Sequence, residues 1–440
     1  MNLFLRIATR NTLKNWRKSL AAIASIAVAF ISLVLFQGYI KNVGGLYREG
    51  FQSRAMYGDM IIENAQAQSV EARLNPEDYY ITKEQQDRLA SYLEGRKERI
   101  TTRVRFLPVT GTITNGESSF LFLAMTYDLK EGAIARRPHW EWDVVYGSPL
   151  SRTEDPAAIV LGQGLGFLMG CVPEHPQELI VQNNGYVPEV RPFHCAHSRV
   201  QLSTTTLSGQ INALDFNIIG LTDAGYKEVD DRWIRMSLEN GQALLNTDRI
   251  KFMSVVLKTG ESPRDFIAGT NAFFAGENLP LRAVHWSDHP LAQLYKQTDS
   301  LLRIFQIFIV LVVMLIVGLS VFNTMVKNVK ERTREIGMLR SLGYRPAQVM
   351  TIFQLETVCI CALGIAAGLA LSVFLTILVN HLEIPYRAGF LSMPVVFRVS
   401  YDAFSYLSCS VLLVVLSLMA SHLSVRSSLK AKIAGNLTHV

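Results

Sequence analysis

Residues 304–325 read IFQIFIVLVVMLIVGLSVFNTM, and residues 326–343 continue as VKNVKERTREIGMLRSLG. The first part carries no charge over 22 positions. A helix of that length spans roughly 33 Å, about the thickness of the hydrocarbon core of a bilayer. In the second part charged residues occupy one helical face, and the other face is apolar, with Val329, Ile336, Leu339 and Leu342. The stretch therefore predicts a membrane-spanning helix followed by a short amphipathic helix.

Two residues delimit the amphipathic helix. Gly343 stands where helices commonly end in a left-handed residue, and Pro346 suits the first turn of a new helix. A helix of this kind either lies on anionic lipid or docks into a partner protein. Its pattern alone does not choose between these two interpretations.

The composition agrees with a membrane protein that has a large water-exposed part. Of the 440 residues 49% are hydrophobic and 18% are charged, the mean hydropathy is +0.20, and soluble domains carry about 25% charged residues. Three further apolar stretches predict spans at Leu20–Ile40, Val358–Val379 and Phe404–Leu423. The first is too long for a signal-peptide core, so we expect a retained anchor. A net charge of +6 lacks the dense basic footprint of a nucleic-acid binder.

The distribution of basic residues predicts the orientation. Residues 1–19 carry a net charge of +5, residues 326–352 carry +4 and residues 424–440 carry +3. The positive-inside rule places these segments in the cytoplasm. We therefore expect a multi-pass protein of the cell inner (cytoplasmic) membrane, with both termini cytoplasmic and residues 41–300 periplasmic.

The predicted fold class is an α-helical membrane protein with four transmembrane helices and a large mixed α+β extracytoplasmic domain inserted between the first and second helices. Along the chain we expect a cytoplasmic segment 1–19, a first span 20–40, the external domain 41–300, a second span with its stalk 301–325, a cytoplasmic segment 326–352, a third span 353–379, an external loop 380–403, a fourth span 404–423 and a cytoplasmic tail 424–440.

Local signals predict the elements of the external domain. Thr82-Lys-Glu-Gln85 is a capping-box pattern that opens a helix to about Glu94. Asn115-Gly116 predicts a hairpin turn between strands at Arg103–Ile113 and Ser118–Met125. We expect strands from both ends of the domain to close one sheet, with residues of about 115–215 inserted as a subdomain.

Two helical stalks are expected to connect the spans to the domain. From about Leu291 to Met325 no proline or loop cluster intervenes, which predicts one continuous helix. The first span is also expected to continue outward, with a break at Gly44-Gly45.

Cys171 and Cys195 are the two cysteines outside the predicted spans. A disulfide is the favoured interpretation in an oxidising compartment, ahead of two free thiols. The third alternative is a Zn or Cu site with His175, His194 or His197. No metal site is predicted.

In the third span, Gly364 and Gly368 belong to a face of small residues. Such faces allow two helices to approach closely. We favour packing within the chain over a contact between two chains.

Asn323-Thr-Met-x5-Glu331-Arg-Thr-Arg-Glu-Ile-Gly-x-Leu-Arg-x-Leu-Gly343 closely resembles the cytoplasmic signature of ABC permeases of the MacB, LolC/LolE and FtsX type. Residues 8–20, 159–170 and 236–257 are similar to other parts of that family. Two parts differ, because the tail 431–440 lacks the Pro-x-x-Ala-Leu-Arg ending of relatives and residues 115–215 resemble no known element.

The resemblance implies a permease subunit that is driven by a separate ABC ATPase subunit, which binds the ATP and Mg. This chain is expected to bind no cofactor and to be no enzyme, since it lacks a G-x-x-x-x-G-K-[ST] loop. Two permease chains, identical or different, are expected to assemble. The residues expected to couple the permease to the ATPase are Glu331, Arg332, Arg334, Glu335, Ile336, Gly337, Leu339, Arg340, Leu342 and Gly343.

In such a complex, ATP binding moves the external domain through the second span, a process that the family calls mechanotransmission. The resemblance implies lipoprotein release, as in LolC/LolE, or tripartite export of a peptide, drug or lipid through a periplasmic adaptor. A third class is regulation of a cell-wall hydrolase, as by FtsX, and a fourth is a non-transporting receptor. Expected partners are the lipid bilayer and, depending on the class, a lipoprotein, an adaptor or a chaperone, but no nucleic acid.

Overall fold

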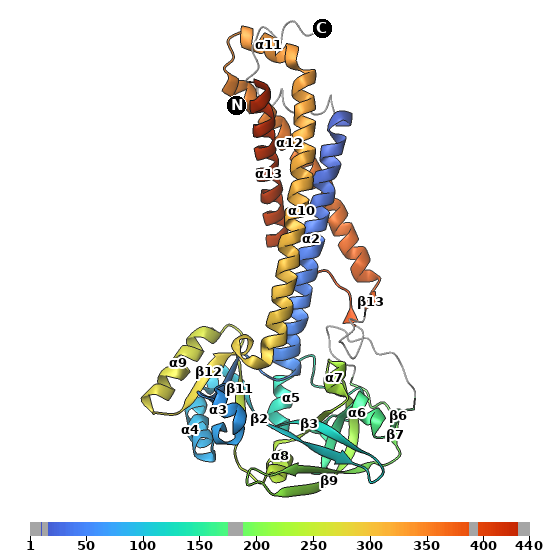
Figure 1. The fold of residues 1–440 in the computed structure, drawn as a ribbon, viewed down its shortest axis with the longest axis vertical. Helices are drawn as coiled ribbons and strands as arrows, with labels where there is room; N and C mark the ends of the chain where they lie inside the picture. The colour runs from blue at the N-terminus through green and yellow to red at the C-terminus, as the bar shows by residue number, and fades with distance from the viewer. Residues whose placement is uncertain (1–9, 11–15, 175–187, 387–394, 430–440) are drawn as a thin grey trace. The chain divides into compact units, whose positions relative to one another are not determined.

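The computed structural model describes residue 10 and residues 16–174, 188–386 and 395–429. The chain divides into two compact units (Figure 1). The helical unit comprises Met1–Gly44, Thr298–Ile384 and Phe397–Val440, and the sheet unit comprises Gly45–Gln297 and Pro385–Val396.

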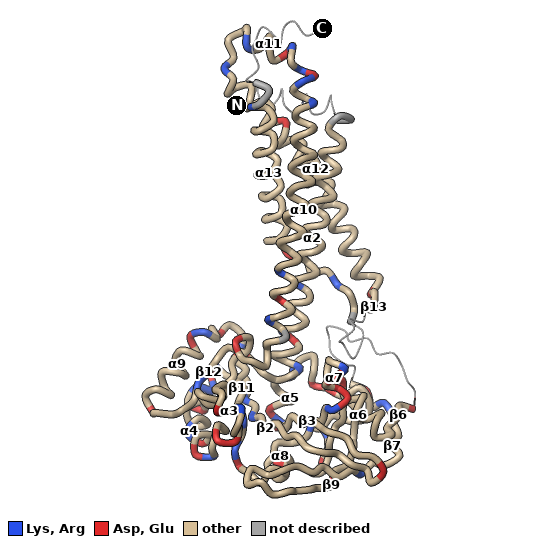
Figure 2. Tube along the Cα trace, in the orientation of Figure 1, with Lys and Arg blue, Asp and Glu red and all other residues tan. Residues whose placement is uncertain are grey.

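Four long apolar helices dominate the helical unit: α2 (Trp16–Glu49), α10 (Gln293–Glu331), α12 (Pro346–His381) and α13 (Ala403–Leu429). Each is long and apolar enough to cross a membrane, which confirms the four predicted spans. Figure 2 shows their middle parts almost free of charged residues. The helices pack on one another through a shared core that includes Ile26, Phe30, Val317, Cys361 and Leu413.

The expected break at Gly44-Gly45 is wrong. Helix α2 continues through both glycines to Glu49 and passes into a π-helical turn, η1 (Gly50–Arg54). A helical glycine costs only about 1 kcal/mol relative to alanine, which the surrounding turns can tolerate. Helix α10 is continuous from Gln293 to Glu331, as predicted for the second stalk.

The sheet unit is built on one ten-stranded sheet. Its strands are β1 (Met60–Asn64), β2 (Ile100–Thr114), β3 (Ser119–Tyr127), β4 (Tyr146–Gly147), β5 (Ala158–Gly162), β8 (Arg199–Thr205), β9 (Ile211–Thr222), β10 (Trp233–Ser237), β11 (Phe252–Leu257) and β12 (Leu281–His285). Their order is β12-β1-β11-β2-β3-β10-β5-β9-β4, and β8 pairs with β2 and β9. Strand β1 therefore lies between β11 and β12, which confirms that strands from both ends of the domain close one sheet.

Helices cover this sheet and fill its connections. They are α3 (Val70–Leu74), α4 (Lys83–Glu94), α5 (Leu129–Ala135), α6 (Gln163–Leu168), α7 (Lys227–Asp230), α8 (Leu238–Leu245) and α9 (Pro263–Gly276). The capping box at Thr82 and Gln85 opens α4 as predicted. The turn at Asn115-Gly116 joins β2 to β3, with Thr114 opposite Ser119 and Gly116 at φ +92°. Two short antiparallel strand pairs complete the described part, β6 (Cys171–Pro173) with β7 (Phe193–Cys195) and β13 (Pro385–Tyr386) with β14 (Val395–Val396).

The expected subdomain at 115–215 is not a separate body. Strand β2 pairs with β11 and β3, and near its end also with β8, so that β2, β3, β10, β5, β9 and β8 form a closed ring of pairs. This ring includes strands from outside 115–215. The close approach of β2 to β8 requires Gly111, because a Cβ there would collide with the Ser203 carbonyl. The 15-residue β2 thus pairs with β11 near its start and with β8 near its end.

Candidate functional site

The connection between α10 and α12 contains a separate short helix, α11 (Thr333–Ser341). Arg332 interrupts the helical backbone at φ −109° and ψ 19°, so α11 is not a straight continuation of α10. At the other end Gly343 has φ +90°, and Tyr344 N–H donates to the Leu339 carbonyl at 3.1 Å. This is the hydrogen bond of a Schellman C-cap. The predicted positions of Gly343 and Pro346 at the helix boundaries are confirmed.

One face of α11 packs on its own chain. Ile336 is 4% exposed and lies in a core with Val329, Val349, Phe353 and Val425, which come from α10, α12 and α13. Gly337 is also buried. The expectation that these two residues contact an ATPase is therefore corrected. Because of the break at Arg332, the side of α11 that carries Ile336 faces α12 and α13 rather than solvent.

The opposite face of α11 is exposed and partly apolar. Met338 is 56% exposed and Leu342 is 70% exposed, and one helical turn separates them. Arg334 and Glu335 lie exposed on the same side, whereas Leu339 and Arg340 are half-buried. Met338 is not part of the predicted apolar face, because that face is centred on Ile336. The exposed pair Met338 and Leu342, with Arg334 and Glu335, is called the α11 face below.

Arg332 points into the chain. Its Nη1 donates to Glu356 Oε1 of α12 at 2.6 Å, and its Nε donates to Glu335 Oε2 at 2.7 Å. The guanidinium also lies over the Phe353 ring, 5.5 Å from its centroid. Arg332 was predicted as an ATPase contact, and in this structure its described partners are internal. Glu356 was not predicted, although it is the only residue among Asp, Glu, Lys and Arg from Pro346 to His381.

Gly364 and Gly368 face α2 of the same chain. A Cβ on Gly364 would lie 2.8 Å from the Ile26 side chain, and one on Gly368 would lie 3.0 Å from the Ala27 carbonyl and the Phe30 side chain. The two helix backbones approach this closely only because both positions lack a side chain.

In the sheet unit, aromatic rings gather where α2 ends and α10 begins. Tyr47 and Phe51 come from the first segment, and Trp286 and Tyr295 come from the second. The ring centroids of Tyr47 and Tyr295 are 5.7 Å apart, and those of Trp286 and Tyr295 are 5.3 Å apart. Phe51 lies 6.1 Å from Tyr57, whose ring in turn contacts Phe106 and Phe252 of the sheet. The four residues Tyr47, Phe51, Trp286 and Tyr295 are called the helix-root cluster.

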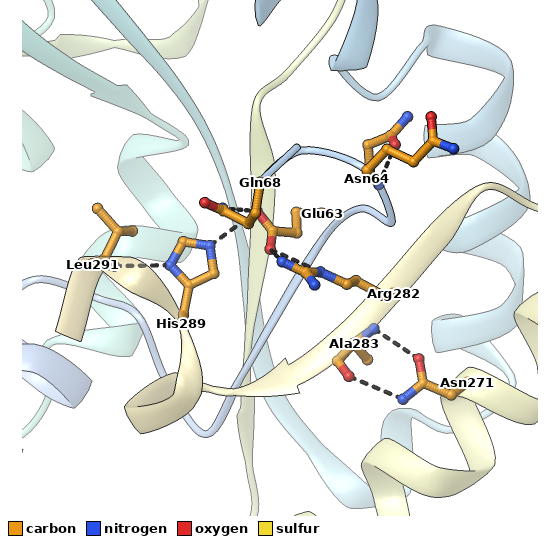
Figure 3. A network of polar contacts seen from close by, with 9 residues as sticks. Glu63, Asn64, Gln68, Asn271, Arg282, Ala283, His289 and Leu291 are labelled. Carbon is orange, nitrogen blue, oxygen red and sulfur yellow. Dashed lines mark hydrogen bonds and ion pairs between the residues drawn. The ribbon is translucent and has the colours of Figure 1, made fainter. Parts of the chain in front are cut away.

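A polar network surrounds the buried Glu63 (Figure 3). Glu63 of β1 accepts hydrogen bonds from Arg282 Nη2 at 2.6 Å and from Gln68 Nε2 at 2.9 Å, and its Oε2 lies 3.1 Å from His289 Nε2. His289 Nδ1 accepts from Leu291 N–H, so the ring also caps the turn before α10. Burial acts to raise the pKa of Glu63, but the His289 and Arg282 contacts outweigh it and lower the pKa to about 2. His289 is thus a satisfied structural histidine.

A second network ties the end of α2 to the sheet. Asp143 lies 2.8 Å from Arg136 and 2.7 Å from Arg235, and all three side chains are buried. Arg136 donates to the Arg54 carbonyl at 3.3 Å, and the Arg54 side chain pairs with Asp223 at 2.9 Å. Burial raises the pKa of the nearby Tyr57 to about 12, against the opposing charge of Arg235. The π-helical turn is therefore held by charge as well as by aromatic contacts.

Cys171 and Cys195 form a disulfide between the paired strands β6 and β7. Their sulfurs are then not available as thiolate ligands. His194 is exposed, His197 lies 3.4 Å from Glu117, and His175 lies outside the described residues.

Comparison with known families covers the C-terminal part of the helical unit. Residues 307–433 match the family described as FtsX-like permease C-terminal. This part of the chain is an FtsX-like permease domain, and it comprises most of α10, all of α11 and α12, and the described part of α13.

The chain is also homologous to MacB over a partial stretch. The chain is 30% identical over 105 residues to the macrolide export ATP-binding/permease protein MacB of Salmonella typhimurium, and the match covers 24% of this chain and 16% of that protein. It is 32% identical over 100 residues to MacB 1 of Yersinia pestis, which covers 23% and 15%. The match thus spans about a sixth of the length of these relatives.

Two solved structures match part of this chain with low TM-scores. The periplasmic region of MacB from Actinobacillus actinomycetemcomitans has a TM-score of 0.33 at 12% identity, covering 55% of this chain and 92% of that one. The extracellular domain of the ABC-type transporter YknZ from Gram-positive bacteria has a TM-score of 0.29 at 12% identity, covering 51% and 98%.

Proposed function

We propose that this chain is the transmembrane subunit of an ABC complex of the mechanotransmission type, and that the α11 face is its contact with a separate ATPase subunit. The observation that carries the proposal is the exposed pair Met338 and Leu342 on a short helix whose other face is fixed to three long helices. The domain to which α11 belongs is that of FtsX-like permeases. No step of ATP chemistry is assigned to this chain.

The α11 face has the properties of a small protein-binding surface. It offers two flexible apolar side chains, Met338 and Leu342, next to the charged side chains of Arg334 and Glu335. Interfaces draw most of their binding energy from a few apolar anchors within a polar rim. A helix that only rests on lipid directs its apolar side toward the membrane. The buried side of α11, which carries Ile336, packs instead on the long helices of its own chain.

The charge distribution supports a cytoplasmic location for α11. The segment 326–352 has an excess of basic residues, as do both termini, which favours the cytoplasmic side under the positive-inside rule. The sheet unit would then lie outside the membrane. We propose that ATP-driven movement of α11 is passed along α10 to the sheet unit.

The proposal is tested by purifying the tagged full-length chain from the membranes of its own organism and assaying the eluate for an ABC ATPase and for ATP hydrolysis. Met338→Glu and Leu342→Glu should each reduce the recovered ATPase at least tenfold, since truncating or charging an anchor commonly costs over about 2 kcal/mol. Ala347→Glu is the matched control, because it adds the same charge at an exposed position outside α11. Equal recovery with all three variants would exclude the α11 face as the contact.

The proteins that elute with the complex also separate the proposed classes of cargo. Lipoproteins would support lipoprotein release, a periplasmic adaptor would support export, and a cell-wall hydrolase would support a regulatory function.

A further inference from the structure

The starting point is a buried carboxylate in an apolar helix. Glu356 is 4% exposed and lies in the third long helix, α12, which has no other acidic residue and no lysine or arginine between Pro346 and His381. An isolated charge in such surroundings is costly, and buried charges in proteins are therefore paired. Its position thus requires a cation on a neighbouring element.

Arg332 provides that cation from the break between α10 and α11. The Nη1–Oε1 distance is 2.6 Å, and the side chains are 18% and 5% exposed. The second arm of the guanidinium binds Glu335, on the first turn of α11. One arginine therefore links the residue before α11, the first turn of α11 and the body of α12.

The apolar contacts around this ion pair do not by themselves fix the orientation of α11 relative to α12. The ion pair does. Ile336 packs among aliphatic and aromatic side chains, and such apolar contacts are non-directional. A buried ion pair adds little net stability, but it is satisfied in only one geometry, and removing one partner costs several kcal/mol. The planar guanidinium makes this requirement toward the buried Glu356, whereas its contact with the exposed Glu335 adds little.

We propose that Arg332 is a positioning residue that acts inside the chain: through Glu356 it fixes α11 to α12, so that a partner that displaces α11 displaces the third long helix together with the second. This inference rests on the proposed function for its consequence, but its structural part stands alone. It also assigns Arg332 a different role from Arg334, which lies exposed on the α11 face.

The structural part is tested by distance measurement between spin labels on Ser341 of α11 and Thr351 of α12, both of which are exposed. The full-length protein is reconstituted in lipid nanodiscs, with Cys359, Cys361 and Cys409 replaced. The doubly labelled protein with Arg332 and Glu356 intact should give one narrow distance distribution. Glu356→Gln should broaden it, whereas Glu335→Gln should not, because Glu335 is 59% exposed and holds Arg332 only at the surface.

A second variant distinguishes loss of the ion pair from a folding defect caused by an unpaired buried charge. Arg332→Met combined with Glu356→Met removes both charges, and such paired apolar replacements are commonly tolerated by the fold. This double variant should also give a broad distribution. A narrow distribution in Glu356→Gln or in the double variant would overturn the proposal.

The consequence for coupling is tested on the complex recovered from native membranes. Glu356→Gln should retain the ATPase at the unaltered level but lower ATP hydrolysis per complex, whereas Met338→Glu should lose the ATPase itself. Loss of the ATPase in Glu356→Gln, with a narrow label distribution, would show that Arg332 acts on the partner and would overturn the proposal. If the unaltered chain recovers no ATPase, the proposed function fails, and the label experiment still decides the internal role of Arg332.

Discussion

The indole of Trp286 stacks on the ring of Phe51, with the ring centroids 5.9 Å apart and the planes 20° apart. Phe51 lies in the π-helical turn that follows α2, and Trp286 lies in the turn that precedes α10. The stack therefore joins the ends of the two helices that enter the sheet unit. Trp286 is 3% exposed, so this contact is part of the core rather than a surface feature.

Trp286→Ala should destabilise the protein by about 3–5 kcal/mol, the usual cost of truncating a buried aromatic residue to alanine. Thermal unfolding of the full-length protein in detergent, followed by circular dichroism, measures the loss. Trp286→Phe should keep most of the stack, and Leu301→Ala, at an exposed position of α10, should have little effect. An unchanged unfolding temperature in Trp286→Ala would exclude a stabilising role for the helix-root cluster.

The glycines of α12 make a second prediction about packing. Gly364→Ala places a methyl group 2.8 Å from the Ile26 side chain, so α2 and α12 must separate. Forcing an extra methyl group into a tight interface typically costs 1–3 kcal/mol, and we expect about that loss for Gly364→Ala and for Gly368→Ala. In Gly318→Ala the nearest atom, in the Leu416 side chain, is 3.9 Å away, so this control should be neutral or slightly stabilising. Equal unfolding temperatures for Gly364→Ala and Gly318→Ala would contradict the packing described.

Features that depend on neighbouring residues could be predicted from the sequence. The four apolar helices, the capping box at Thr82 and Gln85, and the turn at Asn115-Gly116 each depend on a pattern within one short stretch. Gly343 and Pro346 are equally local, because a left-handed C′ residue and an N-terminal proline act on their own helix ends.

Features that depend on residues far apart in the sequence could not be predicted. The pairing of β2 with β8 joins Thr112 to Ser203, and no local pattern encodes it. The side of α11 that is buried depends on the backbone break at Arg332 and on Phe353 and Val425 of other helices. Glu356 is the only acidic residue of the predicted third span, 353–379. A lone carboxylate in such a span indicates a buried cationic partner, but the sequence does not show which residue that partner is.

The Glu63 network predicts a pH dependence of stability. The pKa of Glu63 is lowered from 4.5 to about 2 in the folded protein, so its ionised form is favoured by folding. Its contribution is present above pH 4.5 and is lost as the pH falls from 4.5 towards 2. We expect Glu63→Gln to lower stability at pH 7 by on the order of 3 kcal/mol and to remove this part of the acid sensitivity. Denaturant unfolding at several pH values measures both effects, and parallel curves for the two proteins would refute the assignment.

The Cys171–Cys195 disulfide makes a prediction about redox sensitivity. It closes a loop with a sequence separation of 24, and a loop of that size typically stabilises a fold by about 3 kcal/mol. Reduction should therefore lower the unfolding temperature, and Cys195→Ser should have the same lower value with or without reductant. Thiol alkylation followed by mass spectrometry provides the check, since full modification of both cysteines without reductant would rule out the bond.

The orientation of the chain is tested by cysteine labelling from outside the cell membrane. Glu117, in the turn between β2 and β3, and Lys330, at the end of α10, are both exposed in the structure. A membrane-impermeant maleimide should react with Glu117→Cys in intact spheroplasts, because the charge distribution places the sheet unit outside. Lys330→Cys should react only after the membrane is permeabilised, since the basic segment 326–352 is expected on the inner side. Cys359, Cys361 and Cys409 are replaced beforehand so that only the introduced thiol reacts. Labelling of Lys330→Cys in intact spheroplasts would reverse the orientation and, with it, the proposed contact of the α11 face with an ATPase.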